Sequence, residues 1–228
     1  TMKCHLKRQT FAWLSKRAFA TPYLGSLSLT GGSEVTWEHS FSPYELTFLR
    51  GHRVGKVPLL PGTCYIEFVR VVVVAVHGKR LYSLEDVAFD SIMFLDDDAR
   101  LFGAPLVRIQ LDQSDGALAI TSRRDSNEAW TTHAHMRLQL ASSSSSSSAP
   151  PRLDAEEIQS RCIESVDGDT FYANTGNDYR GEFRALDMAW AGGNMCLSRV
   201  QYDKVETEKV HLRACAYLDA CAHGGLWW

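Results

Sequence analysis

Two groups of residues in this sequence have types and spacing suited to acid–base chemistry. His52 stands nine residues before a Pro61-Gly62 pair, and Asp219 stands four residues before His223. A neutral histidine is a good base near pH 7. A carboxyl group becomes an acid at that pH if burial in apolar surroundings raises its pKa. Residues four apart share one face of a helix, so His223 is expected to hydrogen-bond and orient the Asp219 carboxyl.

A long helix is expected directly after the Pro61-Gly62 turn. The run TCYIEFVRVVVVAVH (63–77) is apolar almost all round, which predicts a helix buried on most sides. Thr63 is a suitable N-cap, and Gly78 is placed to end the helix. Glu67 and Arg70 are expected to mark its solvent-facing edge.

The segments around this helix have the alternating pattern and composition of strands. Asp115-Gly116, between two alternating runs, predicts a hairpin turn. A second helix is expected to begin at the sequence LDACAH, from residue 218. The predicted strands are 81–89, 91–95, 105–111, 117–123, 130–140, 183–191 and 194–202.

A run of seven serines divides the chain. Such a run cannot build a core and indicates a flexible linker. We therefore expect an upstream interdomain linker (1–20), an N-terminal domain with His52 (21–140), the serine-rich linker (141–151) and a C-terminal domain with Asp219 (152–228). Only nine residues follow Asp219, so we expect the second domain to be incomplete and the chain to be a fragment of a longer protein.

Composition excludes several classes of protein. The net charge of −3 gives no reason to expect nucleic-acid binding. The apolar run 71–76 is far too short to span a membrane. Six cysteines without a C-x-x-C pair, and His133 and His135 alone on one strand, argue against a metal site and favour free thiols in the cytoplasm. The basic, acid-free segment 1–20 leaves a plastid transit peptide open.

Three motifs, in order along the chain, resemble those of the dehydratase domains of type I polyketide and fatty-acid synthases. LRGHRVGKVPLLPG (49–62) resembles H-x-x-x-G-x-x-x-x-P, YRGEF (179–183) resembles Y-G-P-x-F, and YLDACAH (217–223) resembles D-x-x-x-Q/H. KRQTFAW (7–13) and TPYLGS (21–26) resemble the linker and opening strands that precede them. The chain departs from the pattern at Lys56, where the family has glycine, and at Ala214 and Cys215, where it has His-Pro.

The resemblance implies an α+β fold of two tandem hot-dog halves, each a curled antiparallel sheet around a central helix, with the site between them. It implies loss of water from a β-hydroxyacyl thioester, giving the α,β-enoyl thioester, with His52 as base, Asp219 as acid and His223 orienting Asp219. Pro61, Gly62, Tyr179 and Gly181 would bind substrate. The loss of water is redox-neutral, so neither a cofactor nor a metal is expected.

The same resemblance implies the partners. The substrate would ride on the phosphopantetheine arm of an acyl carrier protein. Acyltransferase, ketosynthase and ketoreductase domains would be neighbours, and a homodimer would form through the parent synthase. Two alternatives stay open: a hot-dog thioesterase or hydratase acting on coenzyme A esters, and a degenerate dehydratase kept as a scaffold, which the departures at Lys56, Ala214 and Cys215 motivate.

Overall fold

A computed structural model describes residues 23–28, 32–78, 81–95, 104–141, 153–201 and 210–226. Contacts divide the chain into two compact units. Unit 1 comprises Thr1–Tyr44, Tyr65–Met93 and Asp98–Ser143, and unit 2 comprises Glu45–Cys64, Phe94–Asp97 and Ser144–Trp228. The predicted linker 1–20 and nearly all of the serine-rich segment 141–151 lie outside the described residues.

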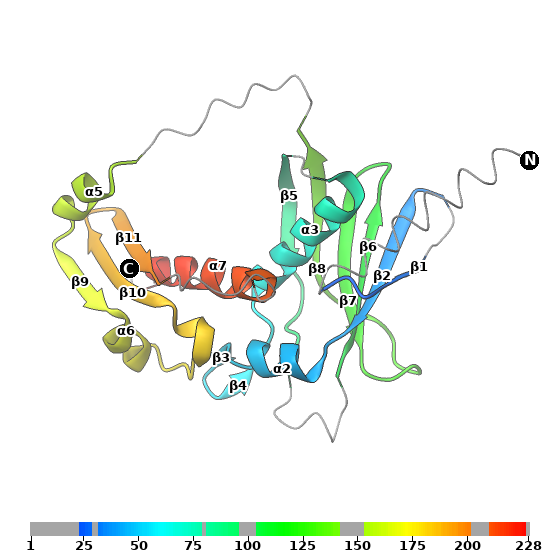
Figure 1. The fold of residues 1–228 in the computed structure, drawn as a ribbon, viewed down its shortest axis with the longest axis horizontal. Helices are drawn as coiled ribbons and strands as arrows, with labels where there is room; N and C mark the ends of the chain where they lie inside the picture. Colours follow the sequence, from blue (N-terminus) through cyan, green and yellow to red (C-terminus); the bar gives the residue numbers. More distant parts are fainter. Residues whose placement is uncertain are drawn as a thin grey trace, which may run out of the picture. The chain divides into compact units, whose positions relative to one another are not determined.

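Unit 1 contains a six-stranded antiparallel sheet with the order β1-β2-β6-β7-β8-β5 (Figure 1). Its inner face is built by alternation, because successive side chains of a strand point to opposite faces. In β6, for example, Val107, Ile109 and Leu111 are buried and their neighbours are partly exposed. The strands are β1 (Ser26–Ser28), β2 (Glu34–Ser40), β5 (Tyr82–Phe89), β6 (Leu106–Asp112), β7 (Ala117–Arg123) and β8 (Thr131–Leu140).

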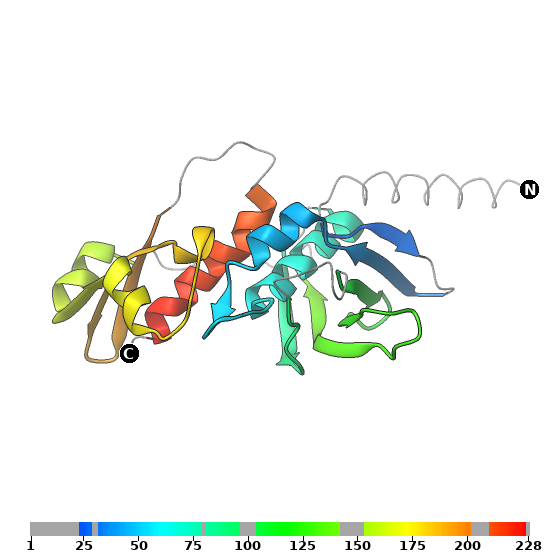
Figure 2. The same ribbon diagram turned by 90° about the horizontal axis from the view of Figure 1, so that it is seen from below.

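The long central helix is confirmed as α3 (Gly62–His77), which lies along this sheet (Figures 1 and 2). The Tyr65 ring packs against Phe89 of β5, with 5.9 Å between ring centroids, and is stacked on His133 of β8 at 6.4 Å. Gly78 follows the helix with φ +71°, the left-handed conformation that favours glycine at this place.

Two details predicted for α3 are wrong. Thr63 is inside the first turn and its Oγ1 has no hydrogen-bond partner within the described chain, so it does not cap the helix. Glu67 is fully buried rather than at a solvent-facing edge, and its Oε1 is 2.5 Å from the Arg70 guanidinium. A buried carboxylate needs such a partner, and the half-exposed Arg70 supplies it from one turn away.

The predicted hairpin at Asp115-Gly116 is confirmed as the turn between β6 and β7. The predicted strand 91–95 is wrong. Within it, only Phe94 forms an isolated bridge, to Leu59, and the Leu95 N–H donates to the Pro58 carbonyl. This short apolar segment pairs with a loop instead of extending a sheet.

Unit 2 contains a three-stranded antiparallel sheet, β11-β10-β9, with helix α7 (Val210–Leu226) lying against β10 and β11 (Figures 1 and 2). The other strands and helices are α2 (Pro43–Leu49, entered from unit 1), β3 (Arg53–Val54), β4 (Val57–Pro58), α5 (Ala155–Arg161), β9 (Glu164–Asp167), α6 (Gly168–Asn174), the 3-10 helix η1 (Gly181–Arg184), β10 (Leu186–Gly192) and β11 (Met195–Val200).

The second helix was expected to begin at residue 218, but α7 begins at Val210. Asp219 is therefore well inside the helix, where its side chain, and not its backbone, is available to a site. The predicted strand 183–191 begins later, at Leu186, because η1 occupies its first residues.

Unit 1 has the hot-dog architecture that the resemblance implies, a long helix on a curled antiparallel sheet. Unit 2 shows a helix on three strands among its described residues, so the tandem arrangement is confirmed only in part. The contacts also place His52 in unit 2 together with Asp219, whereas the predicted domain limits separate them. Within the described residues, no helix combines the length and apolar character needed to cross a membrane.

Candidate active site

His52 lies on the connection between α2 and the small β3–β4 hairpin. The chain turns after α2 through two backbone hydrogen bonds, from Gly51 N–H to Phe48 and from His52 N–H to Leu49. The imidazole is buried, and its Nδ1 is 3.0 Å from the carbonyl oxygen of Leu59. Because a carbonyl only accepts, Nδ1 carries the proton and Nε2 presents its lone pair to the site.

Gly51 allows the segment 177–180 to approach this connection closely, and Gly55 supplies a left-handed backbone conformation beside it. A Cβ on Gly51 would lie 2.5 Å from the Arg180 carbonyl oxygen, and the Arg180 N–H donates to Gly51 O at 2.8 Å. Gly55 has φ +58°, and its N–H donates to Asn177 Oδ1 at 2.7 Å. The glycine of this loop that has a left-handed backbone is therefore Gly55. The family pattern has its glycine one residue later, at the position of Lys56.

Asp219 meets His52 within unit 2. Its Oδ2 lies 3.8 Å from His52 Nε2 and 3.1 Å from Nε2 of His223, one helical turn further along α7. At 3.8 Å the first contact is too long for a hydrogen bond, and neither Asp219 Oδ2 nor His223 Nε2 has a hydrogen-bond partner among the described residues. Hydrogen bonds of catalytic groups commonly tighten only when substrate is bound. Helical spacing thus brings Asp219 and His223 together, and packing within unit 2 brings His52 to Asp219.

The electrostatics of the site keep His52 neutral. Burial is the largest effect and lowers the pKa of His52 below its ordinary 6.5, because desolvation disfavours the imidazolium. The Asp219 charge and the Leu59 carbonyl act in the opposite direction without reversing the shift, and His223 adds to the lowering. A neutral imidazole with Nε2 unprotonated is the form that can accept a proton.

Tyr179 packs against both histidines. Its ring centroid is 5.4 Å from that of His52 and 4.6 Å from that of His223. Burial and the nearby Asp219 charge raise the pKa of Tyr179, so its hydroxyl stays protonated. Phe183 covers His52 from another side at 5.5 Å. These rings shield the polar atoms of the site from water.

The remaining predicted residues contribute backbone conformation. Gly181 begins η1 with φ +55° and follows Arg180, whose N–H is bonded to Gly51. Pro61 and Gly62 open helix α3 two and three residues after Leu59, and the Cys64 N–H donates to the Pro61 carbonyl.

Sequence reasoning missed Tyr172, Asn177 and Phe183. The Tyr172 hydroxyl is 3.3 Å from His223 Nδ1, although 51 residues separate the two. Asn177 holds Gly55, and Phe183 covers His52. Asp167, which caps helix α6, was an available signal that a helix carries Tyr172.

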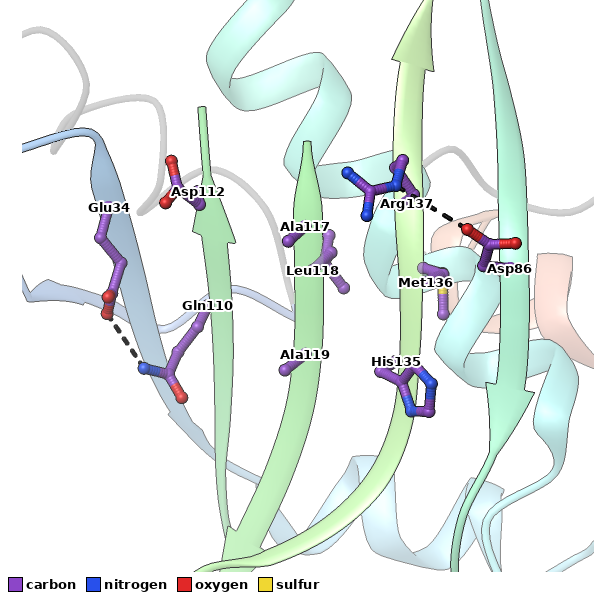
Figure 3. A pocket seen from close by; sticks show the side chains of 10 residues that line it. All are labelled: Glu34, Asp86, Gln110, Asp112, Ala117, Leu118, Ala119, His135, Met136 and Arg137. Atoms are coloured by element: carbon purple, nitrogen blue, oxygen red, sulfur yellow. Dashed lines mark hydrogen bonds and ion pairs between the residues drawn. The ribbon is translucent and has the colours of Figure 1, made fainter. Parts of the chain in front are cut away.

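Two hollows lie in different units. One, of about 260 Å³, is in unit 2 and is lined by His223 and Tyr179 together with Phe171, Asn174, Thr175, Asn177 and Val166. The other, of about 340 Å³, lies on the sheet of unit 1, where Ala117 and Ala119 leave room between a Glu34–Gln110 hydrogen bond and an Arg137–Asp86 ion pair (Figure 3). Since the charged groups around this second hollow are largely exposed, water weakens their interactions, and the unit 2 site is the better candidate.

His133 and His135 make separate contacts. His133 is buried, with Nε2 2.7 Å from Ser122 Oγ, and His135 is exposed, with Nδ1 2.8 Å from Asp90 Oδ2. In the part of the chain that the structure describes, no three or more His, Cys, Asp or Glu side chains gather as metal ligands would.

Comparison with known proteins agrees with this geometry. The sequence model of the family described as "Polyketide synthase dehydratase domain" matches residues 21–125. The highly reducing polyketide synthase lcsB of Purpureocillium lilacinum is 24% identical over 229 residues, which cover 96% of this chain and 9% of that protein. The chain spans less than a tenth of the length of the curated relatives it matches.

Solved structures share the fold. The dehydratase domain from the CurF module of the curacin polyketide synthase matches with a TM-score of 0.75 at 17% identity, covering 89% of this chain and 74% of that one. Two mutants of the CurK dehydratase, both named inactive, match with a TM-score of 0.72 over 89% of this chain and 72% of theirs. One exchanges histidine for phenylalanine, at 20% identity, and the other aspartate for asparagine, at 19%. By its match over residues 21–125 and by its fold, the chain is similar to polyketide synthase dehydratase domains.

Proposed function

We propose that this chain removes water from a β-hydroxyacyl thioester, with His52 as the general base and Asp219 as the general acid. The observation that carries the proposal is the approach of His52 Nε2 to Asp219 Oδ2, 3.8 Å apart in a buried site. The neutral state of His52 supports its role as base.

The reaction balances with these two groups. His52 Nε2 takes the proton from C2, which the thioester carbonyl acidifies, and the electron pair of that C–H bond forms the C2–C3 double bond. The C3–O bond breaks as its oxygen takes the Asp219 proton, and water leaves. His52 is then an imidazolium and Asp219 a carboxylate, so a proton passing from Nε2 to Oδ2 restores both groups. No electrons are gained or lost overall, so the reaction requires no redox cofactor.

The backbone at the start of α3 is proposed to hold the thioester carbonyl. The first N–H groups of a helix have no partners within the helix and carry its positive dipole end. The N–H at Gly62 would therefore stabilise the negative charge that develops on the carbonyl oxygen. Tyr179 and Gly181 are proposed to border the bound acyl chain, and His223 to hold the Asp219 carboxyl in place.

The parent protein is proposed to be a synthase that delivers the substrate on an acyl carrier protein. The relatives are named polyketide synthases, and the named inactivity of the CurK histidine and aspartate mutants fits the pair proposed here. We accordingly expect the phosphopantetheine arm to carry the β-hydroxyacyl group, with acyltransferase, ketosynthase and ketoreductase domains as neighbours.

The test is an assay with synthetic 3-hydroxyacyl carrier-protein substrates of both configurations. Wild-type protein should give the enoyl thioester, seen by mass spectrometry as loss of one water. His52→Ala and Asp219→Asn should each lower turnover by about 100-fold or more while the fold is kept, because each removes one proton-transfer group. The matched controls His135→Gln and Asp187→Asn change groups outside the site and should keep full activity.

Three results would contradict the proposal. Near-wild-type dehydration by His52→Ala would exclude His52 as the base. Release of the free acid would indicate the thioesterase alternative. A folded wild-type protein that turns over neither configuration would indicate the scaffold alternative.

A further inference from the structure

Tyr172 is the centre of a chain of polar contacts that leads from the backbone of unit 2 to Asp219. Its hydroxyl accepts a hydrogen bond from the Leu186 N–H at 3.1 Å and lies 3.3 Å from His223 Nδ1. The opposite ring nitrogen, His223 Nε2, faces Asp219 Oδ2 at 3.1 Å. All three side chains are buried.

The chemistry of these groups fixes the direction of the chain. A backbone N–H only donates, so the Tyr172 oxygen is the acceptor from Leu186. Burial, as the largest cause, raises the pKa of Tyr172 to about 12, which keeps the hydroxyl protonated. Its proton is then available to His223 Nδ1. If Nδ1 accepts this proton, the ring proton of His223 is on Nε2, the atom that faces Asp219.

Close packing holds the hydroxyl in place. Helix α6 approaches β10 so tightly that a Cβ on Gly168 would lie 1.9 Å from the Leu186 carbonyl oxygen. The Tyr172 ring meets the His223 ring edge-on at 5.7 Å, and the Arg184 guanidinium lies 5.1 Å from the Tyr172 ring centroid on its face. The ring therefore has little freedom to turn the hydroxyl away from His223.

We propose that Tyr172 is a positioning residue that holds His223 in its Nε2–H tautomer, so that His223 donates to the Asp219 carboxylate formed during the reaction. The inference rests on the proposed function. When Asp219 gives its proton to the leaving oxygen, a negative charge appears on a buried carboxylate. In this tautomer His223 places an N–H nitrogen 3.1 Å from the oxygen that carries the charge, whereas the other tautomer would present a lone pair to it.

The experiment is a double-mutant cycle with Tyr172→Phe and His223→Gln. Tyr172→Phe keeps the ring and removes only the hydroxyl. It should lower kcat about tenfold, because the free energy of one hydrogen bond corresponds to about that change in rate. The value of KM should stay within about twofold of wild type. A glutamine amide nitrogen always donates and has no tautomers, so Tyr172→Phe should lower kcat by less than about twofold in the His223→Gln background. Tyr82→Phe, which removes a partly buried hydroxyl from unit 1, is the control and should leave kcat unchanged.

A second readout follows the tautomer directly. In the NMR spectrum of protein labelled with ¹⁵N-histidine, the signals of His223 are identified because they disappear in His223→Gln. In wild-type protein these signals should show that Nε2 carries the proton. In Tyr172→Phe they should show a larger share of the tautomer with the proton on Nδ1. This measurement needs no substrate, so it separates the two proposals: a tautomer shift in a protein that does not dehydrate would overturn the proposed function and leave the role of Tyr172 standing.

The role of Tyr172 is overturned if its hydroxyl affects kcat equally in both backgrounds, as a purely structural loss would. It is also overturned if the His223 tautomer is unchanged in Tyr172→Phe. If Tyr172→Phe fails to fold, a fluorinated tyrosine at position 172, whose hydroxyl is a stronger donor, should shift the His223 Nδ1 signal further toward the hydrogen-bonded acceptor state. An unmoved signal there excludes the contact.

Discussion

At the scale of single residues, the Leu59 carbonyl decides which nitrogen of His52 faces the site. Its oxygen lies 3.0 Å from Nδ1 and accepts the proton that this nitrogen carries, which leaves Nε2 as the acceptor. This contact raises the pKa of His52, but desolvation is larger and lowers it below 6.5. The base is thus oriented by a hydrogen bond and kept neutral by burial.

This balance predicts the acid side of the pH–rate profile. Dehydration needs neutral His52, and a lowered pKa means that His52 stays neutral to a pH below its ordinary 6.5. The value of kcat/KM should therefore fall to half on the acid side at a pH below about 6.5. Titration of the His52 ring protons by NMR in the free protein should give the same midpoint. A midpoint at or above that pH would rule out a buried, neutral His52 as the group that limits the rate.

The residues of the site differ in how far sequence could predict them. His52, Asp219 and His223 follow from motifs and helical spacing, and the structure brings all three together. Tyr172 and Asn177 could not be predicted in this way. Their contacts depend on how α6 and the segment after it pack against α7 and the β3–β4 hairpin, which no local pattern reports.

At the scale of helices and strands, long periodic segments were predicted well and short ones were not. Helix α3 and strands β5 to β8 have apolar runs or alternation strong enough to define them. Helices α2, α5 and α6 have seven residues each, too few to be stable without tertiary packing. The predicted start of the second helix, residue 218, is eight residues later than the start of α7 at Val210.

The β6–β7 hairpin gives a prediction about close packing in unit 1. Gly116 has φ +76°, and a Cβ there would lie 2.1 Å from the Leu138 carbonyl oxygen of β8. Gly32 has φ +93°, and a Cβ there would meet nothing within 4 Å. Gly32→Ala should lower the free energy of unfolding by about 1 kcal/mol, from backbone strain alone. Gly116→Ala should cost at least about 3 kcal/mol, since the backbone of β8 must also move.

Urea denaturation of the two glycine variants measures the difference. Because both glycines stand in turns of the same unit with positive φ, the comparison isolates the steric clash. Equal losses of stability in the two variants would show that the backbone of β8 moves away from the added methyl group without a loss of free energy.

At the scale of the whole molecule, each compact unit buries a histidine whose neutral form is favoured. His52 is in unit 2 and His133 is in unit 1. Burial is the largest cause of the lowered pKa in both, and the Ser91 carbonyl near His133 acts in the opposite direction. Protonating either ring therefore costs more in the folded protein than in the unfolded chain.

The sign of the linkage predicts how stability changes with pH. Well above pH 6.5 both rings are neutral in both states and contribute no pH dependence. As the pH falls below that value, the unfolded chain binds protons at His52 and His133 that the folded protein does not, so stability is lost until each folded pKa is passed. The loss can reach about 1.4 kcal/mol per pH unit for each histidine. Three carboxyl groups also have lowered pKa values, those of Asp112, Asp167 and Asp178. They change the stability only at lower pH, outside the range in which the two histidines titrate.

Urea denaturation at pH 7.5 and 5.5 tests this prediction. Wild-type protein should be less stable at the lower pH, and His133→Gln and His52→Gln should each reduce that difference, since glutamine does not titrate. His135→Gln is the matched control for unit 1, because His135 is two residues from His133 on β8 but exposed. If all three variants keep the wild-type pH dependence, neither buried ring is the source of the acid sensitivity. If the pH dependence is smaller in His133→Gln alone, the acid sensitivity arises from unit 1. His52 would then have the same pKa in the folded and unfolded chain.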